Sequence, residues 1–416
     1  MQFIYNLFIF IYRHTVRISA FFGNEKARKW LRGRKDIFNK LSSSIGKDDK
    51  IIWFHCASLG EFEQGRPLIE ALRKQYADYK ILLTFFSPSG YKIRKNYEQA
   101  DYVFYLPIDT KKNARRFVEI VRPRAVFFIK YEFWFNYINE LYKRKIPFFM
   151  VSTIFRPSQH FFGFWGFWFR KQLRKITFLF VQDENSLELL ENIKIYHADI
   201  IGDTRFDRVV VLAEEEKEFP LIKHFVKDKP ILVAGSTWPA DEDKLLTMID
   251  QLDVDFKLII APHQVDNEHI EQIKKKFSKY EPILYSNADE KNLNTSRVLI
   301  IDGIGYLSYL YRYATITYIG GGFGTGIHNL LEAATYGKPV IFGPNHSKFK
   351  EAIELKKNGG GFAISNSEEL ISLCKLLFTD NKKYETSAQS AKNYVIKNAG
   401  ATNRVIDKAK EYLTDN

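Results

Sequence analysis

Cysteine is almost absent from this 416-residue chain, which contains only Cys56 and Cys374. Two cysteines so far apart match neither a zinc-ligand spacing nor a redox pair, so we expect no disulfide framework and a cytosol-facing chain. Metal-ligand patterns are lacking too, since no Asp-x-Asp follows a predicted strand and no His, Cys and carboxylate set has ligand spacing. We therefore expect a protein that uses no metal or other cofactor.

Long uncharged apolar runs are also lacking. Residues 1–12 carry no charge, but Arg13, His14 and Arg17 interrupt the apolar stretch, and a full membrane span needs roughly 20 apolar residues. No small-residue cleavage site follows, which argues against a cleaved signal peptide. The basic run at 26–40 favours an interfacial anchor or a marginal span with its basic side in the cytoplasm. The alternative is an amphipathic helix packed on the protein's own body.

Acidic residues are outnumbered, with 49 Asp and Glu against 62 Lys and Arg, a net charge of +13. Such a surface favours polyanionic partners: nucleic acid, an anionic membrane or phosphorylated substrates. Aromatic residues reach 16%, and seven of them fall within residues 161–169, directly before Arg170, Lys171, Arg174 and Lys175. This pairing is typical of a contact at the lipid headgroups, although an aromatic core beside a solvated basic face is the alternative.

Short apolar runs alternate with helical patterns in two series. Such runs indicate parallel strands buried on both faces, and the chain is long enough for two such domains. The predicted strands of the first series are 50–56, 80–86, 102–106, 125–129, 147–152 and 177–182. Those of the second series are 231–235, 257–261, 297–301, 315–319 and 339–342. The predicted fold class is α/β, with two Rossmann-like domains.

Changes in composition divide the chain into five parts. The expected parts are a membrane-associating segment at 1–35, a first Rossmann-like domain at 36–210, a charged linker at 211–230, a second Rossmann-like domain at 231–379 and a helical tail at 380–416. Ligands of doubly wound sheets bind outside the carboxyl ends of the strands. We therefore expect the site in a cleft between the two domains.

The turn after the first predicted strand is one candidate for the chemistry. It includes Ser58, Gly60 and Glu61, and it opens a predicted helix at 62–76. A carboxylate at this place would face the cleft and could act as a general base. Ser58 and Glu61 also have the Ser-x-x-Glu spacing of a helix capping box, which is the structural alternative.

A glycine-rich turn is the second candidate. Five glycines lie within residues 320–326, after a strand and before a predicted helix that holds His328, Asn329 and Glu332. Glycines let a backbone approach a ligand closely, and a helix N-terminus favours phosphate. A strict Gly-x-Gly-x-x-Gly dinucleotide fingerprint cannot be aligned. On that helix Glu332 would share a face with His328 and could bind ribose hydroxyls, or it could be a surface ion-pair partner.

Shorter signals follow other strands of the second series. Ser236 and Thr237 could donate to phosphate or could cap the next helix, and His263 after Pro262 could contact a base or phosphate or be an ordinary packed histidine. The segment 303–306 carries two further glycines after a strand. Four such strand ends at one edge favour a nucleotide site more than any single signal does.

Taken together, these segments resemble the 3-deoxy-D-manno-octulosonic acid (Kdo) transferases of lipopolysaccharide assembly. The resemblance extends over nearly the whole chain, and its first and last blocks are long and specific. The blocks that carry it are 55–73, 84–91, 105–109, 130–136, 202–209, 235–242 and 320–344.

The resemblance implies a GT-B architecture and inverting transfer of Kdo from CMP-Kdo to a lipid A precursor, lipid IVA. It places the catalytic base at Glu61 and a supporting, acceptor-side carboxylate at Glu132, with Ser58 and Gly60 beside the base. It also maps nucleotide contacts, which join the residues singled out above. The predicted CMP-binding set is Ser236, Thr237, Pro262, His263, Gly305, Tyr306, Leu307, Gly326, His328, Asn329, Leu330, Leu331 and Glu332.

Two positions depart from the family's pattern. The family often has Pro-Arg where this chain has Pro262-His263, and Gly-Glu where it has Gly305-Tyr306. A cation and a carboxylate are thereby replaced, so the nucleotide contacts at these two places are expected to be rearranged or made by the backbone.

The expected partners are CMP-Kdo, a lipid A precursor and the cytoplasmic face of the inner membrane, without nucleic acid. Mono- and bifunctional members share these motifs, so the number of Kdo units transferred is left open. One alternative is another GT-B transferase or epimerase that uses a different nucleotide sugar. The other is a non-enzymatic protein that binds nucleic acid or membrane through its basic surface, and the glycine-rich turns disfavour it.

Overall fold

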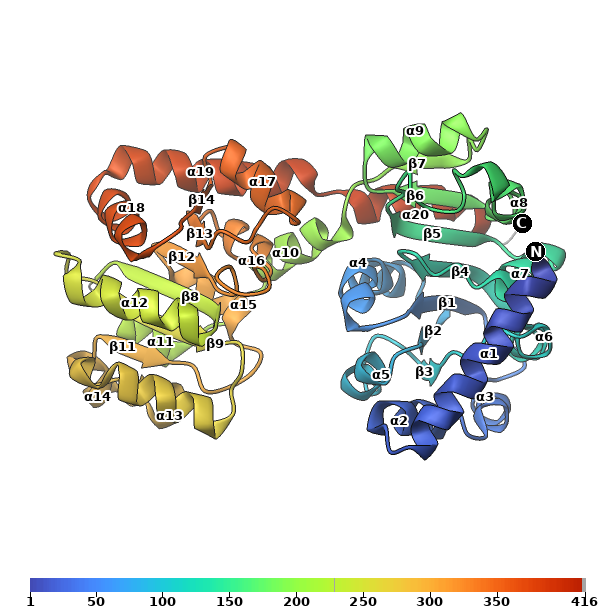
Figure 1. The fold of residues 1–416 in the computed structure, drawn as a ribbon, viewed down its shortest axis with the longest axis horizontal. Coiled ribbons are helices and arrows are strands. Elements are labelled where there is room, and N and C mark those ends of the chain that lie inside the picture. The colour runs from blue at the N-terminus through green and yellow to red at the C-terminus, as the bar shows by residue number, and fades with distance from the viewer. Residues whose placement is uncertain (228, 414–416) are drawn as a thin grey trace. The chain divides into compact units, whose positions relative to one another are not determined.

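The computed structural model describes residues 1–227 and 229–413, so position 228 of the expected linker and 414–416 of the expected tail lie outside it. The chain forms two compact units, each built around its own sheet (Figure 1). Unit 1 comprises Met1–Arg208 and Gly400–Asn416, and unit 2 comprises Val209–Ala399. Helix α10 (Thr204–Glu214) crosses the boundary between them.

Unit 1 holds a seven-stranded parallel sheet in the order β3-β2-β1-β4-β5-β6-β7. Its strands are β1 (Ile51–Cys56), β2 (Lys80–Phe85), β3 (Tyr102–Tyr105), β4 (Pro123–Ile129), β5 (Phe148–Thr153), β6 (Phe178–Val181) and β7 (Ala198–Ile200). The strand order reverses at β1. Strands β2 and β3 are added on one side of β1 and strands β4 to β7 on the other, so β1 pairs with both β2 and β4. This reversal is a topological switch point, the place where doubly wound sheets bind ligands.

Side chains alternate between the two faces of this sheet, as the period of two in a strand requires. Trp53 and Phe128 face one core, where their rings lie 5.1 Å apart, and Phe54 and Phe127 face the other. Helices α6 and α7 cover the first face, and α4 with the returning α20 cover the second. The helices of unit 1 are α1 (Gln2–Phe21), α2 (Glu25–Gly33), α3 (Ile37–Ser44), α4 (Leu59–Gln75), α5 (Pro88–Arg94), α6 (Lys111–Val121), α7 (Phe135–Lys143), α8 (Phe167–Leu173), α9 (Glu184–Asn192) and α20 (Ala401–Leu413).

Helix α1 packs one side on unit 1 and exposes the other. Ile9 is buried, and the Tyr5 hydroxyl donates to the buried carboxylate of Asp109. The outer side is apolar, with Phe3 77% exposed and Phe8 63% exposed. Within the described residues, no helix combines the length and the apolar character needed to cross a membrane.

Unit 2 holds a second seven-stranded parallel sheet, in the order β10-β11-β9-β8-β12-β13-β14. Its strands are β8 (Ile231–Thr237), β9 (Lys257–Pro262), β10 (Ile283–Leu284), β11 (Val298–Ile300), β12 (Ile316–Ile319), β13 (Val340–Phe342) and β14 (Gly361–Ala363). Here the switch point lies at β8, which pairs with both β9 and β12.

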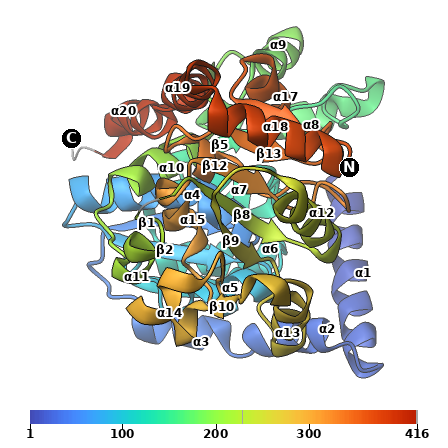
Figure 2. The same cartoon turned by 90° about the vertical axis from the view of Figure 1, so that its left-hand side faces the viewer.

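Helices cover both faces of this second sheet (Figure 2). Side chains of α12, α13 and α18 pack in one core with Leu232 and Ala234 of β8. The helices are α11 (Pro220–Phe225), α12 (Pro239–Gln251), α13 (Asn267–Lys276), α14 (Glu290–Thr295), α15 (Leu307–Leu310), α16 (Leu331–Ala334), α17 (Lys350–Lys357), α18 (Ser367–Thr379) and α19 (Asn381–Asn398).

The predicted α/β class with two Rossmann-like domains is confirmed, and all eleven predicted strands are present. Three short strands, β7, β10 and β14, were not predicted. One predicted helix is wrong, because α16 begins only at Leu331 and has four residues. The backbone N–H of His328 donates instead to Gly320 O, so the chain there is tied back to the glycine turn.

Candidate active site

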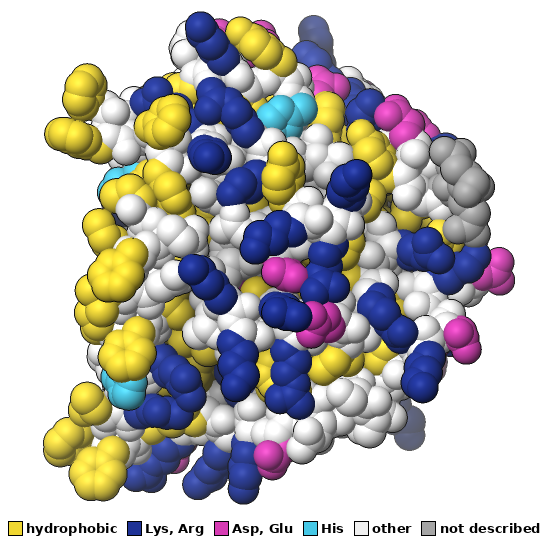
Figure 3. Space-filling model, turned by 90° about the vertical axis from the view of Figure 1, so that its right-hand side faces the viewer, with side chains coloured by type: hydrophobic (Ala, Val, Ile, Leu, Met, Phe, Trp, Pro, Cys, Tyr) yellow, Lys and Arg dark blue, Asp and Glu magenta, His cyan; other side chains and the backbone are white. Residues whose placement is uncertain are grey.

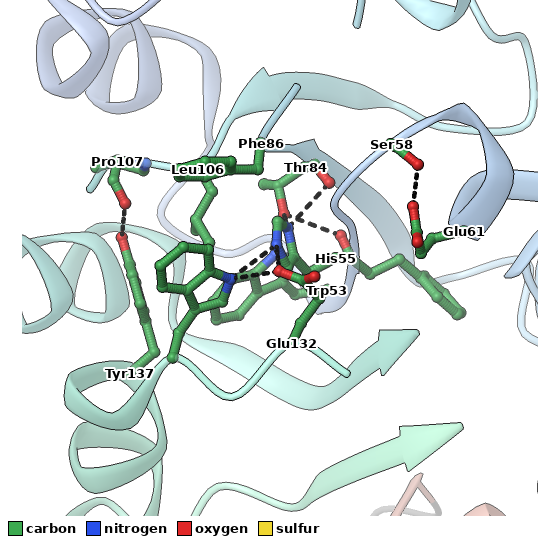
Figure 4. A network of polar contacts seen from close by, with 12 residues as sticks. Trp53, His55, Ser58, Glu61, Thr84, Phe86, Leu106, Pro107, Glu132 and Tyr137 are labelled. Atoms are coloured by element: carbon green, nitrogen blue, oxygen red, sulfur yellow. Dashed lines mark hydrogen bonds and ion pairs between the residues drawn. The ribbon is translucent and has the colours of Figure 1, made fainter. Parts of the chain in front are cut away.

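Glu61 lies at the switch point of unit 1. Strand β1 ends at Cys56, and α4 begins three residues later, which places Glu61 in the first turn of the helix. The Ser58 hydroxyl donates to the Glu61 carboxylate (Figure 4) and does not cap the helix, so the predicted capping box does not form. Glu61 is partly exposed and Gly60 is exposed, which leaves the carboxylate within reach of a substrate.

Glu132 reaches the same edge from β4. It follows Lys130, which has a positive φ of 65° and turns the chain out of the strand. Burial, and to a smaller extent the charges of Glu61 and Glu132, raise the pKa of the Cys56 thiol far above its ordinary value. The thiol at the end of β1 therefore lies within the field of both carboxylates.

A buried histidine connects β1 to the Glu132 loop. Nδ1 of His55 lies 3.1 Å from the carbonyl oxygen of Thr84, which can only accept, so Nδ1 carries the proton. The Nε2 lone pair then faces the Trp134 indole N–H at 3.3 Å. That N–H also donates to Glu132 Oε2 at 2.7 Å, and Oε2 lies 3.5 Å from His55 Nε2. The network holds the Glu132 carboxylate at the strand edge (Figure 4).

Close glycine packing forms the corresponding edge of unit 2. A Cβ on Gly320 would lie 2.3 Å from Ser236 O, and one on Gly322 would lie 2.6 Å from the Gly343 backbone. Real Cβ atoms do not approach so closely, so only glycine allows these backbone segments to meet. The buried Asp241 secures the turn by accepting from Gly321 N at 2.9 Å and from the Tyr318 hydroxyl at 2.6 Å.

Three rings gather beside this turn. His263 stacks on His328 at 4.3 Å and on Trp238 at 4.8 Å, and Trp238 Nε1 lies 3.1 Å from His328 Nε2. Burial, and then the neighbouring His263, lower the pKa of His328. His328 is therefore neutral near pH 7 and accepts the Trp238 N–H.

Strand pairing places several predicted residues next to these rings. Thr237 pairs with Pro262, and His263 N donates to Thr237 O at 3.0 Å. Ser236 has a positive φ of 53° and lies within the same strand end. Gly326 closes the glycine turn by donating to Gly321 O at 3.2 Å.

The remaining predicted residues lie along the two following strand ends. Leu307 packs against Gly235 of β8, while Gly305 has a φ of 91° and Tyr306 contacts Tyr285 and Phe219 edge-on. Leu330 and Leu331 are buried. Asn329 donates to Glu332 at 2.9 Å and accepts from Leu331 N at 3.1 Å. Because α16 starts at Leu331, His328 and Glu332 do not share a helix face, contrary to the prediction.

Sequence reasoning missed four residues of these edges. Trp134 holds Glu132 and also donates to His55, while Trp238 and Asp241 hold the glycine turn and its histidines. A polar residue inside an apolar strand was the only local signal for His55. Some of the partners lie far along the chain, such as Thr84 for His55 and His328 for Trp238.

Known proteins are similar to this chain across both units. Residues 29–208 match the family model of 3-deoxy-D-manno-octulosonic-acid transferase (kdotransferase). The chain is 30% identical over 392 residues to the 3-deoxy-D-manno-octulosonic acid transferase of Rickettsia felis, covering 90% of this chain and 81% of that protein. It is 26% identical over 346 residues to the enzyme of the same description from Aquifex aeolicus, covering 82% and 89% of the two chains.

Solved structures show the fold. UDP-GlcNAc 2-epimerase from Neisseria meningitidis superposes with a TM-score of 0.62 at 17% identity, covering 87% of this chain and 100% of that one. At that identity the likeness concerns architecture alone. The match to the Rickettsia felis enzyme carries more, since 30% identity holds across nine-tenths of the chain. This protein belongs to the 3-deoxy-D-manno-octulosonic acid transferases.

Proposed function

We propose that this chain transfers Kdo from CMP-Kdo to a lipid A precursor, lipid IVA, with Glu61 as the general base. The observation that carries the proposal is the position of Glu61: partly exposed, at the switch point of unit 1, and oriented by the Ser58 hydroxyl. A general base must reach the proton that it removes and must be held in the right direction.

In the proposed reaction, the Glu61 carboxylate takes the proton of an acceptor hydroxyl. The resulting oxygen attacks the anomeric carbon of Kdo, and the bond from that carbon to the CMP phosphate oxygen breaks. CMP leaves with the bonding electron pair, and the anomeric configuration inverts. Glu132, held by the Trp134 indole N–H, is proposed to support the acceptor side of this site.

The edge of unit 2 is proposed to bind the CMP part of the donor. The glycine turn brings backbone N–H groups close to a ligand without intervening side chains. The stacked rings of His263, His328 and Trp238 supply flat surfaces and hydrogen-bonding nitrogens. Asp241 keeps this arrangement in place before the donor arrives, which limits the ordering that binding would otherwise require.

We further propose that unit 1 lies peripherally on the cytoplasmic face of the inner membrane. The outer side of α1 exposes Phe3, Ile4, Phe8 and Ile11, each more than half exposed. Trp165 is 84% exposed in the aromatic stretch, whose Trp168 contacts Tyr5 of α1 at 6.3 Å. Figure 3 shows one face of the molecule, on which apolar side chains line one edge beside many Lys and Arg residues. An acylated acceptor would be reached from such a position.

The test is a transfer assay with the full chain, CMP-Kdo and tetraacylated lipid A precursor, in the presence of EDTA. We expect the acceptor to gain the mass of one or more Kdo units, which would establish donor, acceptor and metal independence together. Intact CMP-Kdo and an unchanged acceptor, with folded protein, would overturn the proposal and direct the search to another nucleotide sugar.

A further inference from the structure

A pocket of about 610 Å³ opens in unit 1 between α1, α2, α3 and the start of α6. Its lining is strongly cationic and contains a single carboxylate, that of Asp36. The six cations around it are Arg13, Arg17, Arg32, Arg34, Lys35 and Arg116. They come from α1, from the end of α2 and the loop after it, and from α6, so the fold brings three separate segments of the chain together.

One of the six cations is used by the fold itself. Arg34 donates to the carbonyl oxygens of Leu106 and Phe86, and its guanidinium lies 3.9 Å from the centre of the Trp30 ring. Burial lowers the pKa of Arg34 to about 9. Arg34 therefore forms the inner wall of the pocket.

The other five cations lack an acidic partner. Across residues 1–227 and 229–413, no carboxylate forms an ion pair with Arg13, Arg17, Arg32, Lys35 or Arg116. Two other arginines of unit 1, Arg66 and Arg73, do hold carboxylates, at 2.6 and 2.8 Å. Like charges gathered around one hollow repel one another, and an anion placed among them relieves that repulsion.

The position of the pocket beside the outer side of α1 indicates what kind of anion fits. Successive residues of a helix are turned by about 100°, so Ile4, Ile11 and Ile18 share the exposed side. Arg13 and Arg17 lie one turn apart at the margin between that side and the buried one. An occupant with a phosphate at the pocket could therefore extend apolar chains along the exposed side of α1.

We propose that this pocket binds the phosphate group of an anionic membrane phospholipid, whose acyl chains lie against the outer side of α1. The site goes beyond the proposed function, because it requires neither donor nor acceptor. It makes the attachment of unit 1 to a membrane specific for headgroup phosphate, whereas apolar insertion alone would not distinguish lipids by charge.

The experiment measures partitioning of the full chain onto vesicles of phosphatidylcholine with or without phosphatidylglycerol. The variant R13Q/R17Q/R32Q removes three pocket cations, and K74Q/K95Q/K194Q removes three exposed lysines of unit 1 that lie outside the pocket. We expect the pocket variant to lose roughly 100-fold in partitioning onto phosphatidylglycerol vesicles, as three cations at about 1 kcal/mol each predict. The lysine variant should lose less than about threefold, because distant charges are screened.

Two further arms separate the sources of binding. The variant I11S/I18S should weaken binding to both kinds of vesicle by a similar factor, because it removes apolar contact without changing charge. Inorganic phosphate at matched ionic strength should compete for the pocket and weaken binding of the unmodified protein to phosphatidylglycerol vesicles, but not that of the pocket variant. If the pocket variant does not fold, Arg17→Gln is compared with Lys74→Gln. Equal losses in the pocket and lysine variants, or the same effect of phosphate on the pocket variant, would overturn the proposal.

Discussion

The switch points of the two sheets have the same architecture but different residues. In unit 1 the edge between β1 and β4 gathers two carboxylates and a buried imidazole, with Glu61 still partly open to solvent. In unit 2 the edge between β8 and β12 gathers glycines and stacked rings, and its carboxylate Asp241 is fully buried as a support. An exposed carboxylate suits proton transfer, and an open backbone turn suits an anion. This difference supports our proposal of base chemistry in unit 1 and donor binding in unit 2.

The substitution Glu61→Gln should break this division most strongly. It keeps the shape of the side chain but removes the base, so we expect the rate of Kdo transfer to fall by roughly 10³-fold. The affinity for CMP should remain within about twofold, because the proposed CMP site lies in unit 2. The matched control is Glu63→Gln, because Glu63 lies on the same helix but pairs with Arg94 at 2.7 Å. Transfer by Glu61→Gln at the rate of the control would contradict the assignment.

A buried carboxyl group in each unit, Asp109 in unit 1 and Glu242 in unit 2, should give the two units different pH dependences of stability. Burial raises the pKa of Asp109, beside α7, to about 6 from 3.8, while in unit 2 the pKa of Glu242 is raised by burial but opposed by His269. The folded state of unit 1 favours protonated Asp109, so binding of this proton stabilises the fold. That stabilisation is complete below pH 3.8 and is lost as the pH rises to about 6. Two pKa units correspond to about 3 kcal/mol.

Urea unfolding of unit 1 between pH about 4 and about 7 measures this loss. In the variant Asp109→Asn that part of the pH dependence should disappear, although its overall stability is lower because Tyr5 and two backbone N–H groups lose a carboxylate acceptor. Identical pH slopes for the variant and the unmodified protein would show that Asp109 does not titrate in this range.

The glycine turn of unit 2 should tolerate substitution at one position and not at another. A Cβ on Gly322 would lie 2.6 Å from the Gly343 backbone, so Gly322→Ala should lower the free energy of unfolding of unit 2 by about 1–3 kcal/mol. At Gly324 the nearest atom, Gly321 O, would be 3.6 Å away, so Gly324→Ala should stay within about 0.5 kcal/mol. Chemical denaturation of both variants measures the difference, and equal stabilities would contradict the close approach.

The smallest expected effect concerns the stacked rings. His328→Ala removes a ring that is neutral near pH 7, so only hydrogen bonding and stacking are lost. We expect the dissociation constant for CMP to rise roughly tenfold, about the contribution of one hydrogen bond, 1.4 kcal/mol. The control His224→Ala removes a partly exposed histidine at the end of α11 that bonds to Asn294. Calorimetric titration with CMP should separate the two, and unchanged affinity in His328→Ala would remove this residue from the proposed donor side.

Local patterns predicted most strands correctly and failed where the signal is short. Strands β7, β10 and β14 have only two or three residues, too few for a periodic pattern. The helix expected at His328 failed because a backbone hydrogen bond to Gly320 holds that segment in another conformation. Glu61 was a candidate from its place after the first strand and Glu132 from the family resemblance, but the hydrogen bonds that orient them were not predicted.

Local patterns in the sequence were enough to predict the two α/β units, the succession of their principal strands along the chain, the glycine turn and the family. Buried apolar runs and glycines act locally along the chain, which is why these features could be predicted. The tertiary structure alone decided which distant residues meet. Pairing of β1 with β4 brings His55 to the Glu132 loop, and folding of α1, α2 and α6 around one hollow assembles the cationic pocket. Such contacts depend on packing between segments far apart in sequence, and no local pattern of residue types records them.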